Sequence, residues 1–123
     1  MNYLYIVIGA AAGAPLRYFL GSRIQERAGG AFPWGTLLVN VSGCLLIGLI
    51  LGIAEARGSL AREARLLLIT GFLGSYTTFS AFGWETYSLA RADDIARAAA
   101  NVAASFVLGL AAVWAGAQLG RLA

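Results

Sequence analysis

The sequence has no histidine, no lysine, a single cysteine and few charged residues of either sign. Charged residues make up 12% of the chain, whereas soluble domains carry about 25%. With only Cys44 available, an intrachain disulfide is excluded, and a transition-metal site built from one chain is not expected. Because Cys44 lies inside an apolar run, we interpret it as a small buried hydrophobe.

Several functional signatures are also missing. We find no ATP-binding loop, no set of nucleophile and base, and no basic stripe with interleaved aromatics. These absences argue against an enzyme, an ATP-driven pump and a nucleic-acid partner. Long linkers, low-complexity segments and internal repeats are absent too, so we predict a single domain over residues 1–123. The first apolar run resembles a signal peptide, but no basic residue precedes it, and we expect it to remain in the mature chain.

The chain is rich in apolar residues and glycine. Its hydrophobic fraction is 59%, its mean hydropathy is +0.74, and 16 of its residues are glycine. Four apolar runs cover roughly residues 3–22, 34–54, 66–90 and 96–120. Each is close to the length of about 20 residues that a helix needs to cross a bilayer, and each is too continuous for barrel strands. We therefore predict an all-α membrane protein with four transmembrane helices, whose glycines allow close helix packing.

The connections between these runs are short and polar. The segment 23–33 reads as a loop, with Pro33 near the start of the second helix. In the segment 55–65, Ser59 is a candidate cap for a short helix that leads into the third span. In the segment 91–97, Asp93 and Asp94 suit the start of the fourth helix.

The arginines give almost no instruction about orientation in the membrane. Four spans put the two termini and the 55–65 loop on one side, with Arg57, Arg62, Arg65 and Arg121. The other side carries Arg23, Arg27, Arg91 and Arg97, or five arginines if Arg17 is included. Either such counting is too crude for the positive-inside rule, or the chain inserts both ways. Two opposite insertions could pair as an antiparallel homodimer, in effect an inverted repeat with its site near the midplane.

The third span is interrupted between Gly71 and Phe82 by glycines and a cluster of hydroxyl residues. Glycine weakens a helix, and serine and threonine compete for its backbone hydrogen bonds. A break in the membrane persists where it is buried in protein or lines water, and its carbonyls can then bind a cation. The alternative is a tightly packed crossing that only needs small residues. Phe79 and Phe82 share a helical face, either for packing or to present positive ring edges to an anion.

Other polar residues occur inside the predicted spans. Thr36 and Asn40 share a face of the second span, and Asn101 and Ser105 share a face of the fourth. Arg17 lies late in the first span, and Glu85 follows the interruption by a turn. Polar groups at this depth usually face a cavity or a partner, although they also tie helices together. Donors on three helices beside a break describe a path for an ion.

Three segments carry a resemblance to one family, and they read Gly9-x-x-x-Gly13-Ala14-x-x-Arg17-Tyr18, Pro33-x-Gly35-Thr36-Leu37-x-Val39-Asn40-x-x-Gly43 and Gly71-Phe72-x-Gly74-x-x-Thr77-Thr78-Phe79-Ser80-x-Phe82-x-x-Glu85. In this combination and order the chain resembles the Fluc-type fluoride channels, also called CrcB proteins. The resemblance covers the first three spans and fits the fourth by length. Such proteins are dual-topology homodimers with two antiparallel pores, which export fluoride passively from the bacterial cytoplasm and relieve fluoride toxicity.

The resemblance implies roles for individual residues. A structural sodium ion would lie at the dimer interface, held by the backbone carbonyls of Gly74 and Thr77 from both chains. The expected fluoride path comprises Phe79, Phe82, Asn40, Ser80, Asn101, Ser105 and Thr36. Arg17 matches a vestibule arginine, and Glu85 stays without an assigned role.

The match has departures and leaves two rival functions. Asn101 stands where the family often has tyrosine, and Ser75 and Ala81 stand where glycine and threonine are common. The first rival is a small dual-topology, proton-coupled multidrug exporter, which needs a membrane carboxylate early in the chain; only Glu85 is available here, near a helix end. The second is a membrane scaffold that transports nothing. The resemblance favours a multi-pass protein of the bacterial inner membrane with fluoride, lipid and a second copy as partners.

Overall fold

The computed structural model describes residues 1–123, and all of its regular structure is helical. The first, second and last spans are the continuous helices α1 (Asn2–Ala28), α2 (Trp34–Arg57) and α6 (Ile95–Arg121). The third span runs from Arg62 to Arg91 in several pieces. All four spans are long and apolar enough to cross a membrane, so the predicted four-span, all-helical architecture of a multi-pass membrane protein is confirmed.

The third span is built from four helical pieces. It begins with α3 (Arg62–Ala64), continues as the π-helix η1 (Arg65–Leu73) and the short α4 (Gly74–Tyr76), and ends as α5 (Phe79–Arg91). A π-helix is rare and often occurs near functional sites. Between α4 and α5 the backbones of Thr77 and Thr78 are extended, with ψ of 160° and 118°. These two residues lie inside the hydroxyl-rich segment that the sequence singled out.

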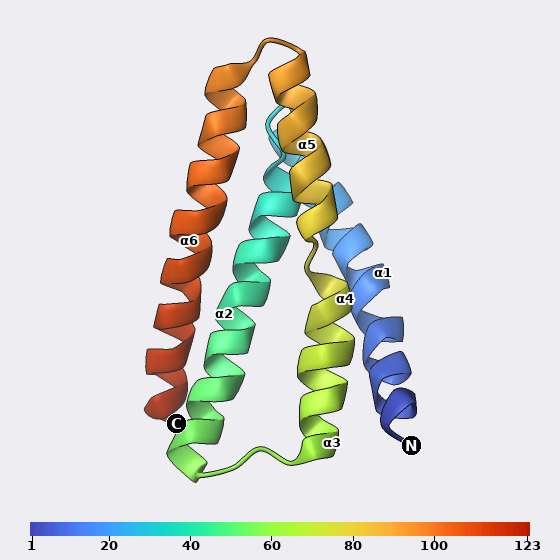
Figure 1. Cartoon of the computed structure of the whole chain (residues 1–123), viewed down its shortest axis with the longest axis vertical. Helices are drawn as coiled ribbons and strands as arrows, with labels where there is room; N and C mark the ends of the chain where they lie inside the picture. The colour runs from blue at the N-terminus through green and yellow to red at the C-terminus, as the bar shows by residue number, and fades with distance from the viewer.

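The four spans form a bundle whose two termini lie at the same end, on opposite sides of it (Figure 1). The N-terminus, the C-terminus and the connection between α2 and α3 are at one end. The connections between α1 and α2 and between α5 and α6 are at the other. The two ends therefore carry the two groups of arginines that the sequence analysis compared.

Glycines set the two closest helix pairs. On α2, Gly48 and Gly52 lie against α6, where Gly116 and Gly120 lie against α2. A Cβ atom at any of these four positions would overlap a backbone carbonyl of the facing helix. On α1, Gly9 and Gly13 meet the backbone of the third span in the same way. Small residues four apart allow this backbone contact between membrane helices.

The third span changes its packing partner at the extended residues. Before them, η1 and α4 pack on α1; after them, α5 packs on α6. Figure 1 shows α5 leaning away from the axis of η1 and α4 toward the upper part of α6. The extended pair Thr77–Thr78 is thus the joint that lets one span contact two different neighbours.

The helix ends correct two expectations and confirm a third. Residues 23–28, predicted as loop, belong to α1. The Gln25 side chain donates to the Gly30 and Phe32 carbonyls and accepts from Gly35 N–H, and these bonds fold the connection against the helix. Ser59 caps no helix, because α3 begins after Ala61 and has no side-chain cap. As expected, an aspartate caps the last helix: Asp94 accepts from Arg97 N–H at 3.2 Å.

Asp94 also pairs with the Arg97 guanidinium, with 2.6 Å between Oδ2 and Nη1. The hydrogen bonds from the Arg97 side chain and backbone hold the pKa of Asp94 below its usual value. The carboxylate is therefore ionised at neutral pH, which favours the start of α6 through the helix dipole.

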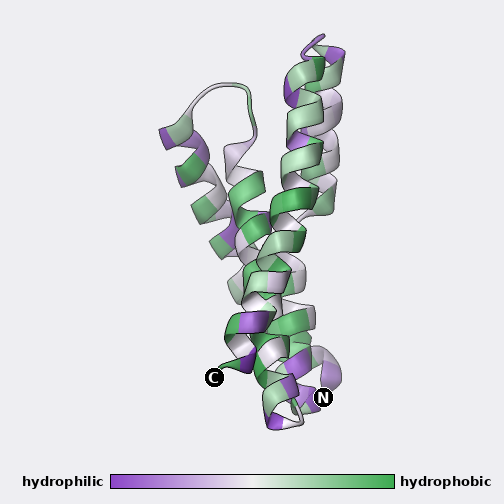
Figure 2. Ribbon diagram, turned by 90° about the vertical axis from the view of Figure 1, so that its left-hand side faces the viewer, coloured by the Kyte–Doolittle hydropathy of each residue, from purple (hydrophilic) through white to green (hydrophobic).

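The surface of the chain is apolar along most of its length. Figure 2 shows hydrophilic residues gathered toward the two ends and hydrophobic ones between them. Large apolar side chains such as Val7, Val107 and Leu110 are exposed. Such a surface suits lipid or a partner chain rather than water.

Candidate functional site

The hydroxyl groups at the joint in the third span form hydrogen bonds with the backbone on both sides of it. Thr77 donates both its N–H and its Oγ1–H to the Leu73 carbonyl, at 3.0 and 2.9 Å. The Thr78 Oγ1 caps α5 by accepting from Ala81 N–H at 3.2 Å. The hydroxyl cluster thus supplies bonds at both helix ends that the joint creates.

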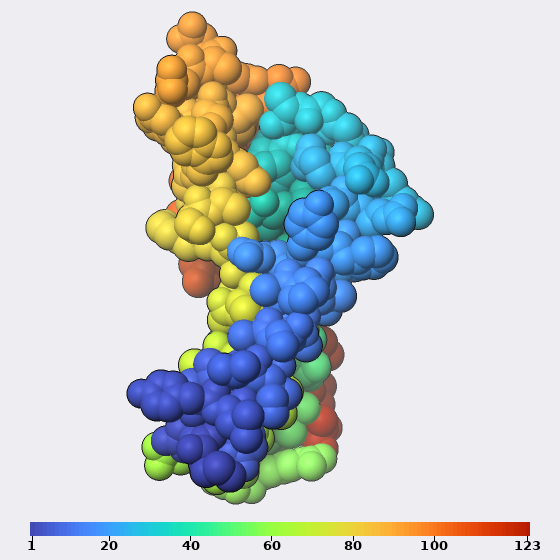
Figure 3. Space-filling model, turned by 90° about the vertical axis from the view of Figure 1, so that its right-hand side faces the viewer, coloured from blue at the N-terminus to red at the C-terminus, as the bar shows by residue number.

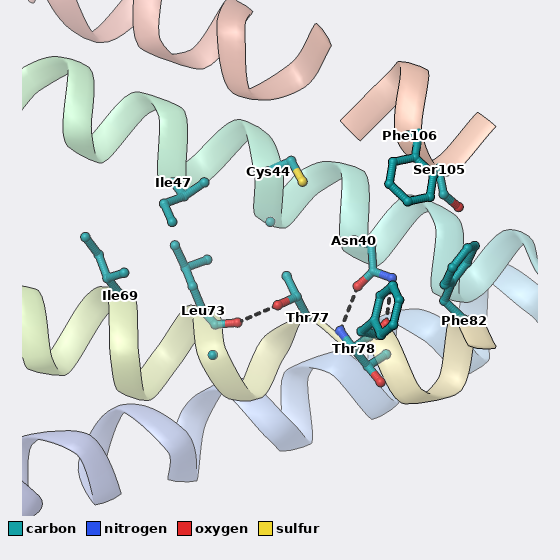
Figure 4. A pocket seen from close by; sticks show the side chains of 13 residues that line it. Asn40, Cys44, Ile47, Ile69, Leu73, Thr77, Thr78, Phe82, Ser105 and Phe106 are labelled. Carbon is teal, nitrogen blue, oxygen red and sulfur yellow. Dashed lines mark hydrogen bonds between the residues drawn. The ribbon is translucent and has the colours of Figure 1, made fainter. Parts of the chain in front are cut away.

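The Asn40 side chain of α2 pairs with the backbone of Thr78. Asn40 Nδ2 donates to the Thr78 carbonyl at 2.9 Å, and Thr78 N–H donates to Asn40 Oδ1 at 2.7 Å. Both bonds are drawn in Figure 4, where Asn40 points from α2 to the extended backbone of Thr78. Thr78 is buried, so these bonds satisfy polar backbone groups that would otherwise be costly.

A second polar contact ties α2 to α4 beside the joint. Ser42 Oγ donates to the Val39 carbonyl at 2.8 Å, so the Tyr76 hydroxyl donates to Ser42 Oγ, also at 2.8 Å. Tyr76 is buried and its ring stacks on Phe72, with 5.6 Å between centroids. The joint is therefore fixed to α2 on both sides.

A groove of about 420 Å³ opens beside the joint, and we call it the aromatic groove. Its walls come from α2, the third span and α6 (Figure 4). It is lined by Asn40, Gly43, Cys44, Ile47, Ile69, Leu73, Gly74, Thr77, Thr78, Phe79, Phe82, Ser105 and Phe106. None of these residues is charged, so the groove offers hydroxyls, an amide, backbone groups and rings.

Three phenyl rings form a row along the groove. The Phe79 and Phe82 rings are 5.5 Å apart and tilted by 42°. Phe82 meets Phe106 of α6 almost edge-on, at 6.4 Å and 78°. The exposed fraction of Phe82 is 8%, whereas that of Phe79 is 77% in the single chain. Phe79 therefore sits where the groove meets the outside of the chain.

A second hollow of about 600 Å³, which we call the arginine cavity, lies between α1, the start of α2 and α5. Figure 3 shows this face hollowed between α5, in yellow and orange, and the blue and cyan segments. Arg17 lines it and forms no ion pair. Thr36 Oγ1 donates to Glu85 Oε1 at 2.6 Å, while the buried Glu85 Oε2 has no partner.

The structure brings most of the predicted site residues to these two hollows. The aromatic groove holds Asn40, Gly74, Thr77, Phe79, Phe82 and Ser105. The arginine cavity holds Arg17, Thr36 and Glu85. Thr78, which the sequence analysis gave no role of its own, lines both hollows and so lies in the wall between them.

Two predicted residues lie outside both hollows. Ser80 is exposed, and its hydroxyl is 3.3 Å from that of Thr78. Asn101 is 1% exposed and donates to Thr86 Oγ1 at 2.9 Å, while Thr86 donates to the Phe82 carbonyl at 2.8 Å. Asn101 therefore faces α5 rather than the groove, because α5 packs on α6 at this level.

Sequence reasoning missed the partners that hold the site together. The pairs Asn40–Thr78, Ser42–Tyr76 and Asn101–Thr86 each join residues far apart in the chain. The only signal was that a polar residue inside a span needs a partner. That signal marks one member of a pair without identifying the other.

Comparison with known proteins gives matches over nearly the whole chain. The family model described as "CrcB-like protein, Camphor Resistance (CrcB)" matches residues 4–117. The "Fluoride-specific ion channel FluC" of Solibacter usitatus is 49% identical over 121 residues, which are 98% of this chain and 99% of that protein. The protein of the same name from Roseiflexus sp. is 47% identical, over 99% of this chain and 98% of its own length.

Proposed function

The chain belongs to the CrcB family, and we propose that it is a fluoride-selective channel that lets cytoplasmic fluoride leave the cell passively. The observation that carries this proposal is the near full-length similarity to proteins named as fluoride-specific ion channels. Their names also confirm the prediction that the chain is not an enzyme. Passive exit through the bacterial inner membrane would relieve fluoride toxicity.

The aromatic groove supplies what a small, strongly hydrated anion needs. To enter, fluoride must exchange its water shell for hydrogen-bond donors and positive ring edges. Asn40, Ser105, Phe79 and Phe82 offer these in the groove, whereas the Thr36 hydroxyl of the arginine cavity already donates its proton to Glu85. Because the groove holds no charged side chain, the ion is not bound so tightly that it cannot leave. The half-buried Arg17 would favour anions at the mouth of the cavity.

Ser80 and Asn101 were also expected on the fluoride path, because their side chains can donate hydrogen bonds to an anion. Their positions outside both hollows give no support for direct contact with the ion in the single chain. We therefore assign the path to the groove residues and treat Asn101 as a support of α5.

We also propose a structural sodium ion held by the backbone carbonyls of Gly74 and Thr77. Both residues line the aromatic groove, and the extended backbone of Thr77 takes its carbonyl out of the helical pattern. Carbonyl oxygen is a ligand that hard cations accept, and the chain has no cluster of His, Cys, Asp or Glu that would suit another metal. When bound, the cation would raise the local potential for an anion nearby.

The proposed assembly is an antiparallel homodimer with two pores. One chain offers only two of the proposed carbonyl ligands, and its groove opens outward at the exposed Phe79. A second copy would complete the ligand set and cover that opening. The balanced arginines at the two ends allow the two copies to insert in opposite directions.

Fluoride efflux from liposomes with and without a proton gradient tests this function against its rivals. We expect the purified protein to release fluoride down its own gradient when the internal and external pH are equal. Efflux that requires an imposed proton gradient would contradict a passive channel and indicate proton coupling, for which Glu85 is the available carboxylate. Liposomes that retain all their fluoride would contradict the channel and leave the exporter and the scaffold as the rivals.

A further inference from the structure

The two hydrogen bonds between Asn40 and Thr78 engage both the oxygen and the nitrogen of the side-chain amide. Oδ1 accepts from Thr78 N–H at 2.7 Å and Nδ2 donates to the Thr78 carbonyl at 2.9 Å. This pairing fixes the orientation of the carboxamide. In the reverse orientation the Nδ2–H donor would face the Thr78 N–H donor, and the Oδ1 acceptor would face the Thr78 carbonyl. One of the two protons on Nδ2 remains for another acceptor in the aromatic groove.

This pairing replaces a bond that a continuous helix would contain. In an α-helix the N–H of residue 78 donates to the carbonyl of residue 74. Here Thr78 N–H donates to Asn40 instead, which leaves the Gly74 carbonyl without that helical partner. The same extended geometry, with ψ of 160° at Thr77, takes the Thr77 carbonyl out of the helical direction. These two carbonyls are the ligands of the proposed sodium ion.

We propose that Asn40 is a positioning residue for the sodium site, in addition to any contact it makes with fluoride. It holds Thr78 away from Gly74 and so keeps the Gly74 and Thr77 carbonyls available to the cation. This inference rests on the proposed function, because it presupposes the sodium site. One side chain would then act on both ions. The two bonds of Asn40 to Thr78 order the cation ligands, and its remaining Nδ2 proton faces the groove that fluoride would use.

A neighbouring contact provides the matched comparison. Ser42 also joins α2 to the third span beside the joint, through the Tyr76 hydroxyl. Ser42 makes no hydrogen bond to Thr78, and its contact with Tyr76 does not involve the Thr78 N–H. If Asn40 only adds stability, its loss and the loss of Ser42 should affect sodium binding alike.

Selective labelling of threonine can report on this joint alone. Thr77 and Thr78 are the only adjacent threonines in the chain. Protein labelled with 13C-carbonyl and 15N threonine therefore gives a single cross-peak in an HNCO spectrum, which joins Thr78 N–H to the Thr77 carbonyl carbon. Titration with sodium chloride, at ionic strength kept constant with N-methylglucamine chloride, then follows the cation ligand directly and without any flux measurement.

We expect a saturable sodium shift of this peak in the wild-type protein and in Ser42→Ala. In Asn40→Ala the apparent sodium affinity should fall by about tenfold or more, as for other residues that orient metal ligands. An equal sodium response in Asn40→Ala and wild type would overturn the inference and leave the proposed channel intact. A wild-type peak that ignores sodium would remove the sodium site, and this inference with it, whether or not the liposomes release fluoride.

A measurement on the wild-type protein covers the case in which Asn40→Ala does not fold. The Thr78 amide donates at 2.7 Å from a buried position, so its proton should exchange slowly with deuterated solvent. Exchange at the rate of an unprotected amide would show that the pairing with Asn40 does not hold and would overturn the inference.

Discussion

At the scale of single residues, the two phenylalanines of the groove have very different surroundings. Phe82 is packed between Phe79 and Phe106, whereas Phe79 is largely exposed in the single chain. We expect Phe79→Ile and Phe82→Ile both to reduce fluoride efflux, because each removes a ring edge. Only Phe82→Ile should also destabilise the isolated fold, by about 1 kcal/mol. Efflux and thermal unfolding of both variants check this, and unchanged efflux in both would exclude the rings from the path.

The charge of the groove gives a second prediction. Asn40→Asp places a negative charge in a groove that has no charged side chain. It also removes the donor to the Thr78 carbonyl, so the carboxylate would face that oxygen. We expect fluoride efflux from liposomes to fall by at least about tenfold, which corresponds to about 1.4 kcal/mol of added barrier. Normal efflux would mean that Asn40 does not face the anion.

The site residues could be predicted from the sequence only in part. Asn40, Thr36 and Ser105 stood out because a polar side chain inside a span needs a partner or a cavity. The sequence could not show that Thr36 bonds Glu85, or that Asn101 bonds Thr86, because both contacts depend on how the spans pack. Thr78 received no role of its own for the same reason, since its pairing with Asn40 uses backbone groups that the residue type does not mark.

At the scale of helices, the contact between α2 and α6 depends on glycine at positions of backbone contact. Gly116→Ala would force a Cβ against the Leu45 carbonyl, which cannot move as a side chain can. We expect this variant to lose about 1–3 kcal/mol of stability, typical of overpacking. The control is Gly109→Ala, two turns earlier on the same helix, where the new Cβ would meet the Cys44 Sγ at an ordinary 3.6 Å. Thermal unfolding in detergent compares the two, and equal stability would show that the helices can separate without cost.

The cap of α6 gives a prediction about pH. The pKa of Asp94 is lowered in the folded chain. The stability that its carboxylate adds to the start of α6 is therefore present above the unfolded pKa of about 3.9 and is lost as the pH falls through the folded pKa. We expect the Arg97 amide to exchange faster with solvent as the pH drops below about 4, relative to the intrinsic rate at each pH. In Asp94→Ala this amide should exchange fast at every pH. A wild-type protection that does not change with pH would remove the carboxylate from the cap.

The existence of the helices followed from the sequence, but their pairing did not. Runs of uncharged residues marked all four spans, and Asp94 marked the start of the last. The end of α1 was placed too early because Arg23 and Glu26 looked like a loop, although they continue the helix beyond the apolar run. The exchange of α1 for α6 as the partner of the third span depends on which helix faces meet, and no sequence period encodes that.

At the scale of the whole molecule, the even distribution of arginine predicts insertion in both directions. Ser59 and Ala92 are exposed at opposite ends of the bundle and can each be changed to cysteine in a protein that carries Cys44→Ser. We expect a membrane-impermeant maleimide to label about half of the chains at either site in intact cells, because neither end has the excess of arginine that fixes orientation. Full labelling at one site and none at the other would show a single orientation and contradict the antiparallel dimer.

We propose above that the groove beside the Thr77–Thr78 joint conducts fluoride, and we expect it to do so in preference to other halides. Parallel efflux measurements with fluoride and chloride electrodes on the same batch of reconstituted liposomes test it most directly. We expect rapid fluoride release from vesicles that retain their chloride, and loss of that release in Phe79→Ile. Release of both halides at similar rates, or of neither, would contradict it.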